Sequence, residues 1–260
     1  MSMDAWNHLR RLTSARIALG RSGGSLPTRE RLDFQLAHAR ARDAVLSPFD
    51  AEGFAARLRA LGRTVLAVHS AARDRAEFLR RPDLGRRLAA ESSALLAEHA
   101  SAAAPFDLVI IVSDGLSTHA VATHGEPLLA ALLPLVATSG WSLAPLIVAH
   151  HGRVALQDEI GGLLNATISV MLLGERPGLG SADSLGAYFT HSPSPGRKDA
   201  ERNCISNIRD GGLTIANAAA KLHYLLGRSF HLRMSGVRLK DDGAALPDTH
   251  DVGSSRLEKH

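Results

Sequence analysis

The chain has 260 residues, of which 45% are apolar, 22% charged and only 4% aromatic, and its formal net charge is +4. This composition fits a globular protein long enough to bury a sizeable core, and it favours helix-rich α/β packing over a β-sandwich. A single cysteine excludes an internal disulfide framework, and no apolar run approaches the roughly 20 residues of a membrane span, so we expect a cytoplasmic protein without a signal peptide.

The first part of the chain is predicted to form a small helical domain over residues 1–58. Residues 14–26 are rich in Gly and Ser, which is typical of a loop. Pro27 then begins a helix, because proline suits the first helical turn. The excess positive charge of the chain is mostly arginine, and it is concentrated in the first ninety residues.

Residues 59–240 are predicted to form a second domain, in which short apolar runs alternate with helical patterns. The runs of strand length fall at 64–68, 107–115, 143–149 and 167–173. The helical patterns fall at 51–79 with an interruption near Gly62, at 86–98, at 117–138 with a break near Pro127, at 154–165 and at 214–227. Strands that are apolar nearly throughout and separated by helices indicate an α/β fold, with a parallel sheet covered by helices on both faces. Residues 241–260 are predicted to be a disordered tail.

Special residues follow three of these predicted strands. They spell SDG at 113–115, GRV at 152–154 and GERPG at 174–178. Ligands bind at the carboxyl ends of the strands of a parallel sheet. The last of the three motifs also belongs to a long stretch, 172–208, that is dense in Gly, Pro, Ser and Arg. We expect this stretch to be irregular and to line a ligand crevice, where its glycines let the backbone approach a large flat ligand.

Two residues of that stretch are candidates for ligand contact. For Glu175 two interpretations stay open: an exposed salt bridge with its neighbour Arg176, worth about 0–1 kcal/mol, or an acceptor for amide or hydroxyl donors of a ligand. Cys204 lies in NCISNI, which matches no thiol-protease signature, and no histidine is placed by sequence to activate it. Packing or ligand contact is therefore favoured over catalysis for this thiol.

Common catalytic signatures are missing from the sequence, namely GxGxxG, Walker A, HExxH and CxxC. The pair His150-His151 lies where a predicted strand ends, but no cysteine or carboxylate partner is suggested at metal-ligand spacing. Solvated or hydrogen-bonded imidazoles are therefore favoured over a metal site.

Five blocks of sequence are specific enough to indicate a family. They are SARIALGRSGGSLPTRERLDFQLAHARARDAV at 14–45, RPDLGRRL at 81–88, VIIVSDGLSTHAV at 109–121, HGRVALQDEIGGLLNA at 151–166 and LLGERPGLGSADSLGAYFTHSPSPGRKDAERNCISNIRDGG at 172–212. Together they resemble the small (light) subunit of ethanolamine ammonia-lyase, an adenosylcobalamin-dependent enzyme. The resemblance covers nearly all of residues 14–240.

The resemblance implies a Rossmann-like domain after the small helical N-terminal domain. It also implies assembly with a larger subunit, a TIM barrel that binds ethanolamine, with the cobalamin bound base-on between the two subunits. The cofactor contacts of the family correspond to Val154, Glu175 and Cys204. In this interpretation Glu175 accepts hydrogen bonds from the amide side chains of the corrin, while Val154 and Cys204 supply close-packed surface.

The resemblance further implies that the cofactor carries the chemistry. Homolysis of the cobalt–carbon bond gives an adenosyl radical, which takes hydrogen from the carbon that bears the hydroxyl group, and the products are acetaldehyde and ammonia. We therefore expect no catalytic residue on this chain and no activity without the large subunit. Some relatives carry a long extra N-terminal segment used to enter a bacterial microcompartment. Here the recognisable fold begins by about residue 14, so we expect a free cytoplasmic enzyme.

One further cobalamin signature is interpreted as a coincidence. Residues 248–253 spell DxHxxG, by which base-off cobalamin proteins ligate cobalt through histidine. The signature needs a preceding strand, a following helix and dozens of further residues to hold the nucleotide tail, and here it lies in a polar tail.

Two other functions stay open on the residues alone. The first is a stand-alone α/β enzyme that binds a nucleotide or a phosphosugar, which the glycine-rich strand ends suggest, although the sequence has no phosphate-loop signature. The second is an assembly or nucleic-acid-binding module that uses the arginine-rich N-terminal part. An arginine-rich face that meets an acidic protein partner is favoured over RNA binding, because no signature with stacked aromatic residues is present.

Overall fold

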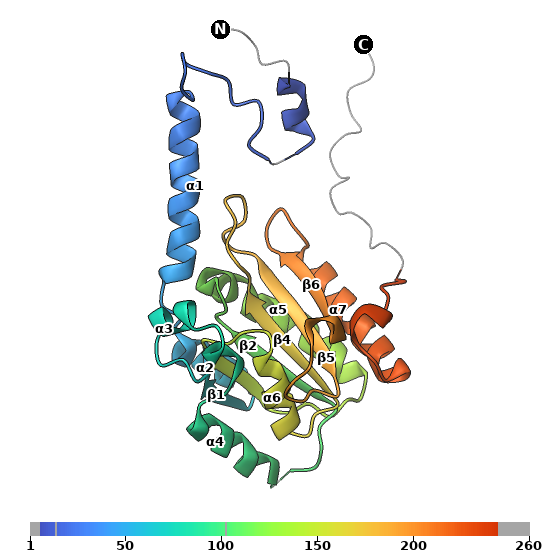
Figure 1. Cartoon of the computed structure of the whole chain (residues 1–260). Helices are drawn as coiled ribbons and strands as arrows, with labels where there is room; N and C mark the ends of the chain where they lie inside the picture. Colours follow the sequence, from blue (N-terminus) through green and yellow to red (C-terminus); the bar gives the residue numbers. More distant parts are fainter. Residues whose placement is uncertain (1–5, 14, 102, 244–260) are drawn as a thin grey trace.

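The computed structural model of the chain describes residues 6–13, 15–101 and 103–243. Its centre is a six-stranded sheet with the strand order β1-β3-β2-β4-β5-β6 (Figure 1). The strands are β1 (Val65–His69), β2 (Leu108–Ser113), β3 (Leu146–His150), β4 (Ile168–Gly174), β5 (Leu185–His191) and β6 (Arg202–Ile208). The helices are α1 (Thr28–Leu46), α2 (Ala51–Ala60), α3 (Arg75–Arg80), α4 (Ala90–Ser101), α5 (Thr118–Thr138), α6 (Leu156–Leu163) and α7 (Ile215–Leu232), with short 3-10 helices η1 (Asn7–Arg11), η2 (Leu84–Arg86), η3 (Asp199–Glu201) and η4 (Gly236–Arg238).

The strands β1, β3, β2 and β4 are parallel to one another. Every residue of β2 and β4 is buried, because side chains that alternate along each strand meet helices on both faces of the sheet. The four predicted strands are confirmed as β1 to β4, with ends that differ by a few residues.

Helices cover both faces of the sheet, so the α/β class is confirmed. On one face, α2, α5 and α7 share a hydrophobic core with Leu108, Ile110 and Val112 of β2. On the other face, α4 and α6 share a second core with Val109 and Ile111. The predicted helices at 86–98, 154–165 and 214–227 are confirmed as α4, α6 and α7, and the interval 51–79 holds α2 and α3 with β1 between them.

The prediction of a sheet that is parallel throughout is wrong for its last two strands, and residues 172–208 are not one irregular segment. β5 runs antiparallel to β4, and β6 runs antiparallel to β5. Only three of the seven residues of β6 are buried, and its register shifts where Asn207 adopts a φ of +60°. A polar strand that is buried on one side and interrupted by a bulge lacks the continuous apolar run that marks β1 to β4.

Helix α5 contradicts the predicted break near Pro127. It runs without interruption, with Pro127 and Pro134 inside it. A proline in a helix interior costs about 3 kcal/mol, but ten residues of α5 are buried, and their burial offsets this cost. Within the described ranges, α5 is also the one helix that is long and apolar enough to cross a membrane. Half of its apolar window is buried inside the protein, as in a core helix.

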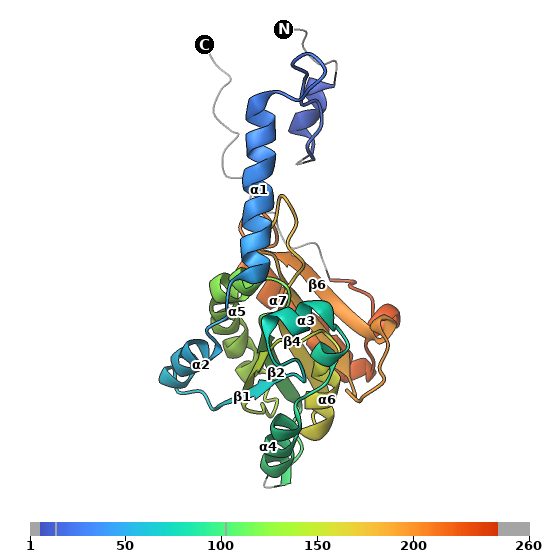
Figure 2. The same cartoon turned by 60° about the vertical axis from the view of Figure 1, so that its left-hand side comes forward.

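The predicted N-terminal helix is confirmed as α1, which stands apart from the sheet (Figures 1 and 2). Of its 19 residues, all of which the structure describes, only Ala44 is buried. Helix α2, in contrast, contributes Phe54 and Leu58 to the core of the sheet. A domain boundary at residue 58 stays a prediction.

Most of the predicted tail, residues 244–260, lies outside the described residues, and so does the DxHxxG sequence at 248–253. The expectation of a disordered tail and the interpretation of that sequence as a coincidence therefore stay predictions.

Candidate functional site

A cavity of about 420 Å³ lies where the strands β2, β3 and β4 end. All three strand-end motifs that the sequence singled out contribute to it. Its lining residues are Gly115, Leu116, Gly152, Arg153, Val154, Leu173, Gly174, Glu175, Arg176 and Tyr188. The parallel topology explains this convergence, because the carboxyl ends of neighbouring parallel strands lie at the same edge of a sheet.

Asp114, which follows β2, joins this strand end to the end of β3 and to α3. Its carboxylate is fully buried and accepts hydrogen bonds from the backbone N–H of His151 (2.7 Å), from the His151 ring nitrogen Nδ1 (3.1 Å) and from Nη1 of Arg75 (3.0 Å). Arg75 also donates to the carbonyl oxygen of Gly115 (2.6 Å). A buried carboxylate needs such partners, since an unpaired charge in the interior is strongly destabilising.

The two histidines at the end of β3 have separate structural roles. The expected hydrogen-bonded imidazole is confirmed for His151, which contacts Asp114. His150 stacks on His69 with ring centroids 4.7 Å apart, and burial lowers its pKa. Among the residues that the structure describes, no group of three or more His, Cys, Asp or Glu side chains could hold a metal ion.

Glu175 lies on the wall of the cavity, and hydroxyl groups hold its carboxylate. Ser184 Oγ donates to Oε2 (2.6 Å), and the Tyr188 hydroxyl donates to Oε1 (3.2 Å). Gly186 leaves room for this arrangement, because a Cβ atom there would lie 2.7 Å from the carboxylate and from the Tyr188 ring. Each carboxylate oxygen can accept two hydrogen bonds, so Glu175 keeps acceptor capacity for a further donor.

Val154 lines the same cavity as Glu175 and is half-buried. The residue before it fixes its position. The backbone N–H of Arg153 donates to the carbonyl oxygen of Gly85 (2.7 Å), and its guanidinium lies 4.2 Å from the centre of the Phe78 ring. The structure therefore brings Val154 and Glu175 together at one surface.

Cys204 does not line this cavity. It lies on β6, pairs in register with Tyr188 of β5, and lines a separate hollow of about 330 Å³. Tyr188 thus stands between Cys204 and Glu175. Cys204 is exposed as a residue, but the protein atoms around its sulfur and the nearby Glu175 charge raise its pKa to about 11. The thiol is therefore protonated at neutral pH, which argues against a nucleophilic role.

The sequence analysis missed Tyr188, Ser184 and Asp114 as individual contributors to the site. Burial raises the pKa of Tyr188, so its hydroxyl keeps the proton that it donates. Its signal in the sequence was AYFT at 187–190, because aromatic and β-branched residues are enriched in strands. Asp114 was visible only as the middle residue of SDG, and nothing in the sequence alone joins it to Arg75.

Comparison with known proteins extends the resemblance to nearly the whole chain. A family model described as ethanolamine ammonia-lyase light chain matches residues 3–240. A protein of Pseudomonas fluorescens is 54% identical over 242 residues, which is 93% of this chain and 88% of that protein.

Two further relatives agree with this match. A protein of Ralstonia nicotianae is 53% identical over 242 residues (93% of this chain, 90% of that protein), and one of Azotobacter vinelandii is 55% identical over 240 residues (92% and 89%). All three relatives bear the name ethanolamine ammonia-lyase small subunit. Because the family model and these relatives span nearly the entire sequence, the chain belongs to the ethanolamine ammonia-lyase light-chain, or small-subunit, family.

Proposed function

We propose that this chain is the small subunit of an adenosylcobalamin-dependent ethanolamine ammonia-lyase, which converts ethanolamine to acetaldehyde and ammonia together with a large subunit. Membership in the family supports a lyase subunit that needs a partner. The structural observation that carries the proposal is the Glu175 carboxylate, which two hydroxyls hold at the cavity with acceptor capacity left over.

The shape and chemistry of the cavity fit one wall of a corrin site. A corrin bears amide side chains, and amide N–H groups are the donors that a carboxylate accepts. Gly115, Gly152 and Gly174 line the wall, and a Cβ atom at any of them would lie within 3 Å of protein atoms, so these glycines let the strand ends pack closely beneath a ligand. A volume of about 420 Å³ is too small to enclose the macrocycle with its side chains. The large subunit, which the resemblance describes as a TIM barrel, would supply the opposite wall.

The residues of this chain would bind and orient the cofactor. Glu175 would accept from corrin amides, Val154 would supply apolar contact beside it, and Cys204 would pack against the ligand edge as a neutral thiol. Base-on binding requires no cobalt ligand from this chain. When bound, the cofactor supplies the radical chemistry. Substrate contacts would lie on the large subunit, so none of these residues is assigned a catalytic role.

The proposal includes the finer organisation that the family resemblance implies. Residues 59–240 would form a Rossmann-like domain for cofactor and subunit binding, after a helical domain at 1–58 and before a disordered tail at 241–260. The assembled enzyme would work free in the cytoplasm, without enclosure in a bacterial microcompartment.

The decisive assay is release of ammonia from ethanolamine in the presence of adenosylcobalamin. It would compare this chain, its large subunit and the two together. Ammonia from the mixture only is the expected result. Failure of the two chains to associate and release ammonia would overturn the proposal. Tight binding of a nucleotide or phosphosugar by this chain without the partner would favour a stand-alone enzyme instead.

The role of Glu175 can be tested in the assembled complex. Glu175→Gln removes the charge but keeps the size, and it should raise the dissociation constant of the cofactor about tenfold or more, as expected for a lost hydrogen bond to a charged group. Glu98→Gln, at an exposed position on α4, is the matched control and should change nothing. An unchanged dissociation constant for Glu175→Gln, with normal folding, would remove Glu175 from the site.

A further inference from the structure

The N-terminal arm, defined as residues 6–13 and 15–47, projects from the body of the protein (Figures 1 and 2). It consists of η1, a loop and α1. Hydrogen bonds join it to the body near the C-terminal end of α1. The Thr118 hydroxyl donates to the carbonyl oxygen of Ala44 (3.3 Å), and Nε of Arg75 donates to that of Val45 (2.8 Å).

Helix α1 receives little stabilisation from the rest of the chain. Helices in proteins gain most of their stability from packing an apolar face. Yet Leu32 is 58% exposed, Phe34 45% and Leu36 51%. Large apolar side chains that remain exposed on a projecting helix indicate a surface that becomes covered in an assembly.

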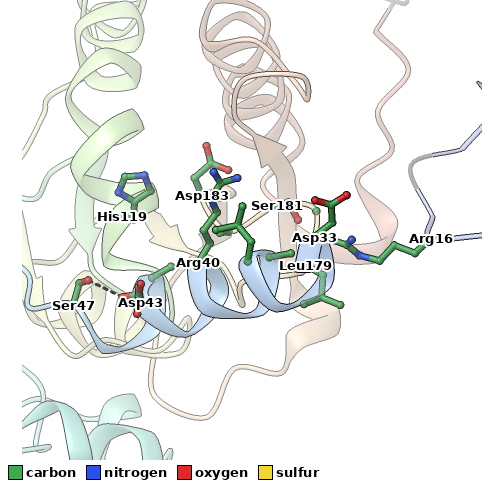
Figure 3. A pocket seen from close by; sticks show the side chains of 14 residues that line it. Arg16, Asp33, Arg40, Asp43, Ser47, His119, Leu179, Ser181 and Asp183 are labelled. Carbon is green, nitrogen blue, oxygen red and sulfur yellow. Dashed lines mark hydrogen bonds between the residues drawn. The ribbon is translucent and has the colours of Figure 1, made fainter. Parts of the chain in front are cut away.

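A groove of about 650 Å³ separates one face of α1 from the loop that follows β4 (Figure 3). The lining residues on α1 recur at helical spacing, which places them on one face: Asp33, Leu36, Ala37, Arg40, Asp43, Ala44 and Ser47. The facing wall is the segment 179–183, with His119 from the start of α5 and Arg16 from the loop before α1. Leu36 and Leu179 give the groove apolar surface. Its charged lining is mixed, with Arg16 and Arg40 beside three aspartates, so the positive charge of the arm lies mainly outside the groove.

The facing wall is held in place without a partner. Gly178 and Ser181 exchange two backbone hydrogen bonds (3.0 and 3.3 Å). The Ser117 hydroxyl donates to the carbonyl oxygen of Ala182 (2.8 Å), and Nε2 of His124 lies 3.4 Å from the carboxylate of Asp183. This wall of the groove is therefore preformed, which lowers the entropy cost of binding on that side.

The groove and the proposed cofactor site share one loop. Glu175 and Arg176 line the cavity at the strand ends, and the segment 179–183 lines the groove a few residues later. A partner that closes the cavity over Glu175 would therefore lie next to the groove.

The charge of the arm indicates the chemistry of its partner. Eight arginines and three acidic residues fall within it, which gives +5 with histidines neutral. Such a surface attracts an acidic partner. The exposed leucines and the apolar part of the groove favour a protein segment over a nucleic acid, since protein interfaces combine an apolar centre with a polar rim.

We infer that the N-terminal arm and its groove form the docking surface for an acidic, partly apolar segment of the large subunit. This inference rests on the proposed function, because the large subunit that it names as the partner comes from that proposal. The docked segment would place apolar side chains between Leu36 and Leu179 and cover the exposed stripe of α1. Its carboxylates would lie beside exposed arginines of the arm outside the groove lining, namely Arg21, Arg29 and Arg31.

Hydrogen exchange on the full chain, free and in the assembled complex, tests the docking directly. In the free chain the α1 amides should exchange quickly, and in the complex their exchange should slow by roughly tenfold or more. The amides of β2 and β4, which are buried in both states, should change little. Equal exchange of α1 in both states would overturn the inference.

A substitution pair gives an independent test. Leu36→Glu places a carboxylate in the groove and should weaken binding of the large subunit about tenfold or more, as for a central interface residue. Because Leu36 lies outside the core, the free variant should unfold at the same temperature as the wild type. Arg63→Glu, an exposed charge reversal just before β1, is the control and should bind normally.

The outcomes separate this inference from the proposed function. If the wild-type chain assembles and releases ammonia while Leu36→Glu binds as tightly, the docking surface is wrong and the proposed function stands. If the wild-type chain does not assemble, both fall. Protection of α1 by a DNA duplex or by self-association, in place of the large subunit, would also overturn the docking surface.

Discussion

The two halves of the sheet hold the candidate site in different ways. In the parallel half, the strand ends are joined by a buried carboxylate, Asp114, that contacts Arg75 and His151. In the antiparallel half, Ser184 and Tyr188 hold Glu175 by neutral hydroxyl groups on a partly open surface. The parallel half thus fixes the backbone of the site, and the antiparallel half presents polar groups that can still bind.

This difference explains how one edge of a sheet can have a rigid backbone and also present polar groups that are free to bind a ligand. Breaking a buried ion pair strongly destabilises a protein, because removing one partner leaves an unpaired charge in the interior. Hydrogen bonds between a hydroxyl and a partly exposed carboxylate contribute less and leave lone pairs free. We therefore expect substitutions in the parallel half to act on folding, and those in the antiparallel half to act on binding with a smaller effect on folding.

The largest expected effect comes from Asp114→Ala. The substitution leaves the guanidinium of Arg75, which is 15% exposed, without its carboxylate. We expect the free energy of unfolding to fall by about 3–5 kcal/mol, the range for breaking a buried ion pair. Urea unfolding followed by circular dichroism measures it.

The control for this prediction is the same substitution in an exposed pair. Asp83 contacts Arg81 at 2.7 Å, and both side chains are 60% exposed. Asp83→Ala should change the unfolding curve little, because solvent screens exposed pairs. Equal effects of the two substitutions would contradict the distinction between a rigid parallel half and the rest of the surface.

The same comparison explains which parts of the fold could be predicted from sequence. Strands buried on both faces are written as continuous apolar runs, such as LVIIVS at 108–113, and β2, β3 and β4 were found from such runs. The edge strand β1 is less buried, but its sequence VLAVH at 65–69 is also an apolar run. β6 is buried at only three of its seven residues and its pairing with β5 contains a bulge, so RNCISNI at 202–208 gave no apolar run to detect. At Pro127 the sequence predicted a helix break that does not occur. The free-energy cost of a proline inside α5 is outweighed by the burial of the helix, which only the tertiary structure shows.

The candidate site also has one part that could be predicted from sequence and one part that could not. The three strand-end motifs were predicted to converge, because parallel topology alone brings them to one edge. The support of Glu175 by Tyr188 could not be predicted, since it depends on the register between β4, β5 and β6. The position of Cys204 outside the cavity follows from the same register. The prediction that residues 172–208 are irregular contained no register and could not give this position.

A smaller effect on folding is expected from Tyr188→Phe, in the antiparallel half. The variant keeps the ring and removes the hydroxyl that donates to Glu175 (3.2 Å). We expect a loss of about 0.5–1.5 kcal/mol in the free energy of unfolding, the usual net contribution of one hydrogen bond. Tyr224→Phe on α7, where the tyrosine is 37% exposed, is the matched control. A loss as large as that of Asp114→Ala would show that the antiparallel half is no less rigid.

The smallest expected effect is a pH dependence that sharpens the description of the parallel half. Burial lowers the pKa of His150, which stacks on His69 at the ends of β1 and β3. In the unfolded chain this imidazole takes up a proton near its ordinary pKa of about 6.5, whereas the folded chain resists protonation until a lower pH. Below that ordinary pKa the unfolded state therefore binds more protons, and stability falls as the pH falls.

His150→Phe should remove this part of the pH dependence, because phenylalanine can stack on His69 but cannot be protonated. The measurement is the unfolding temperature of wild type and variant between pH 7.5 and 5, the pH window on both sides of about 6.5. As the pH falls below 6.5, the unfolding temperature of the wild type should fall relative to that of the variant. This relative change should level off once His150 is also protonated in the folded wild type. His119→Phe, at an exposed position on α5, should leave the wild-type slope unchanged. If His150→Phe and wild type keep parallel curves throughout, the stacked imidazoles take no part in the acid sensitivity of the parallel half, and its rigidity rests on Asp114 and the apolar core.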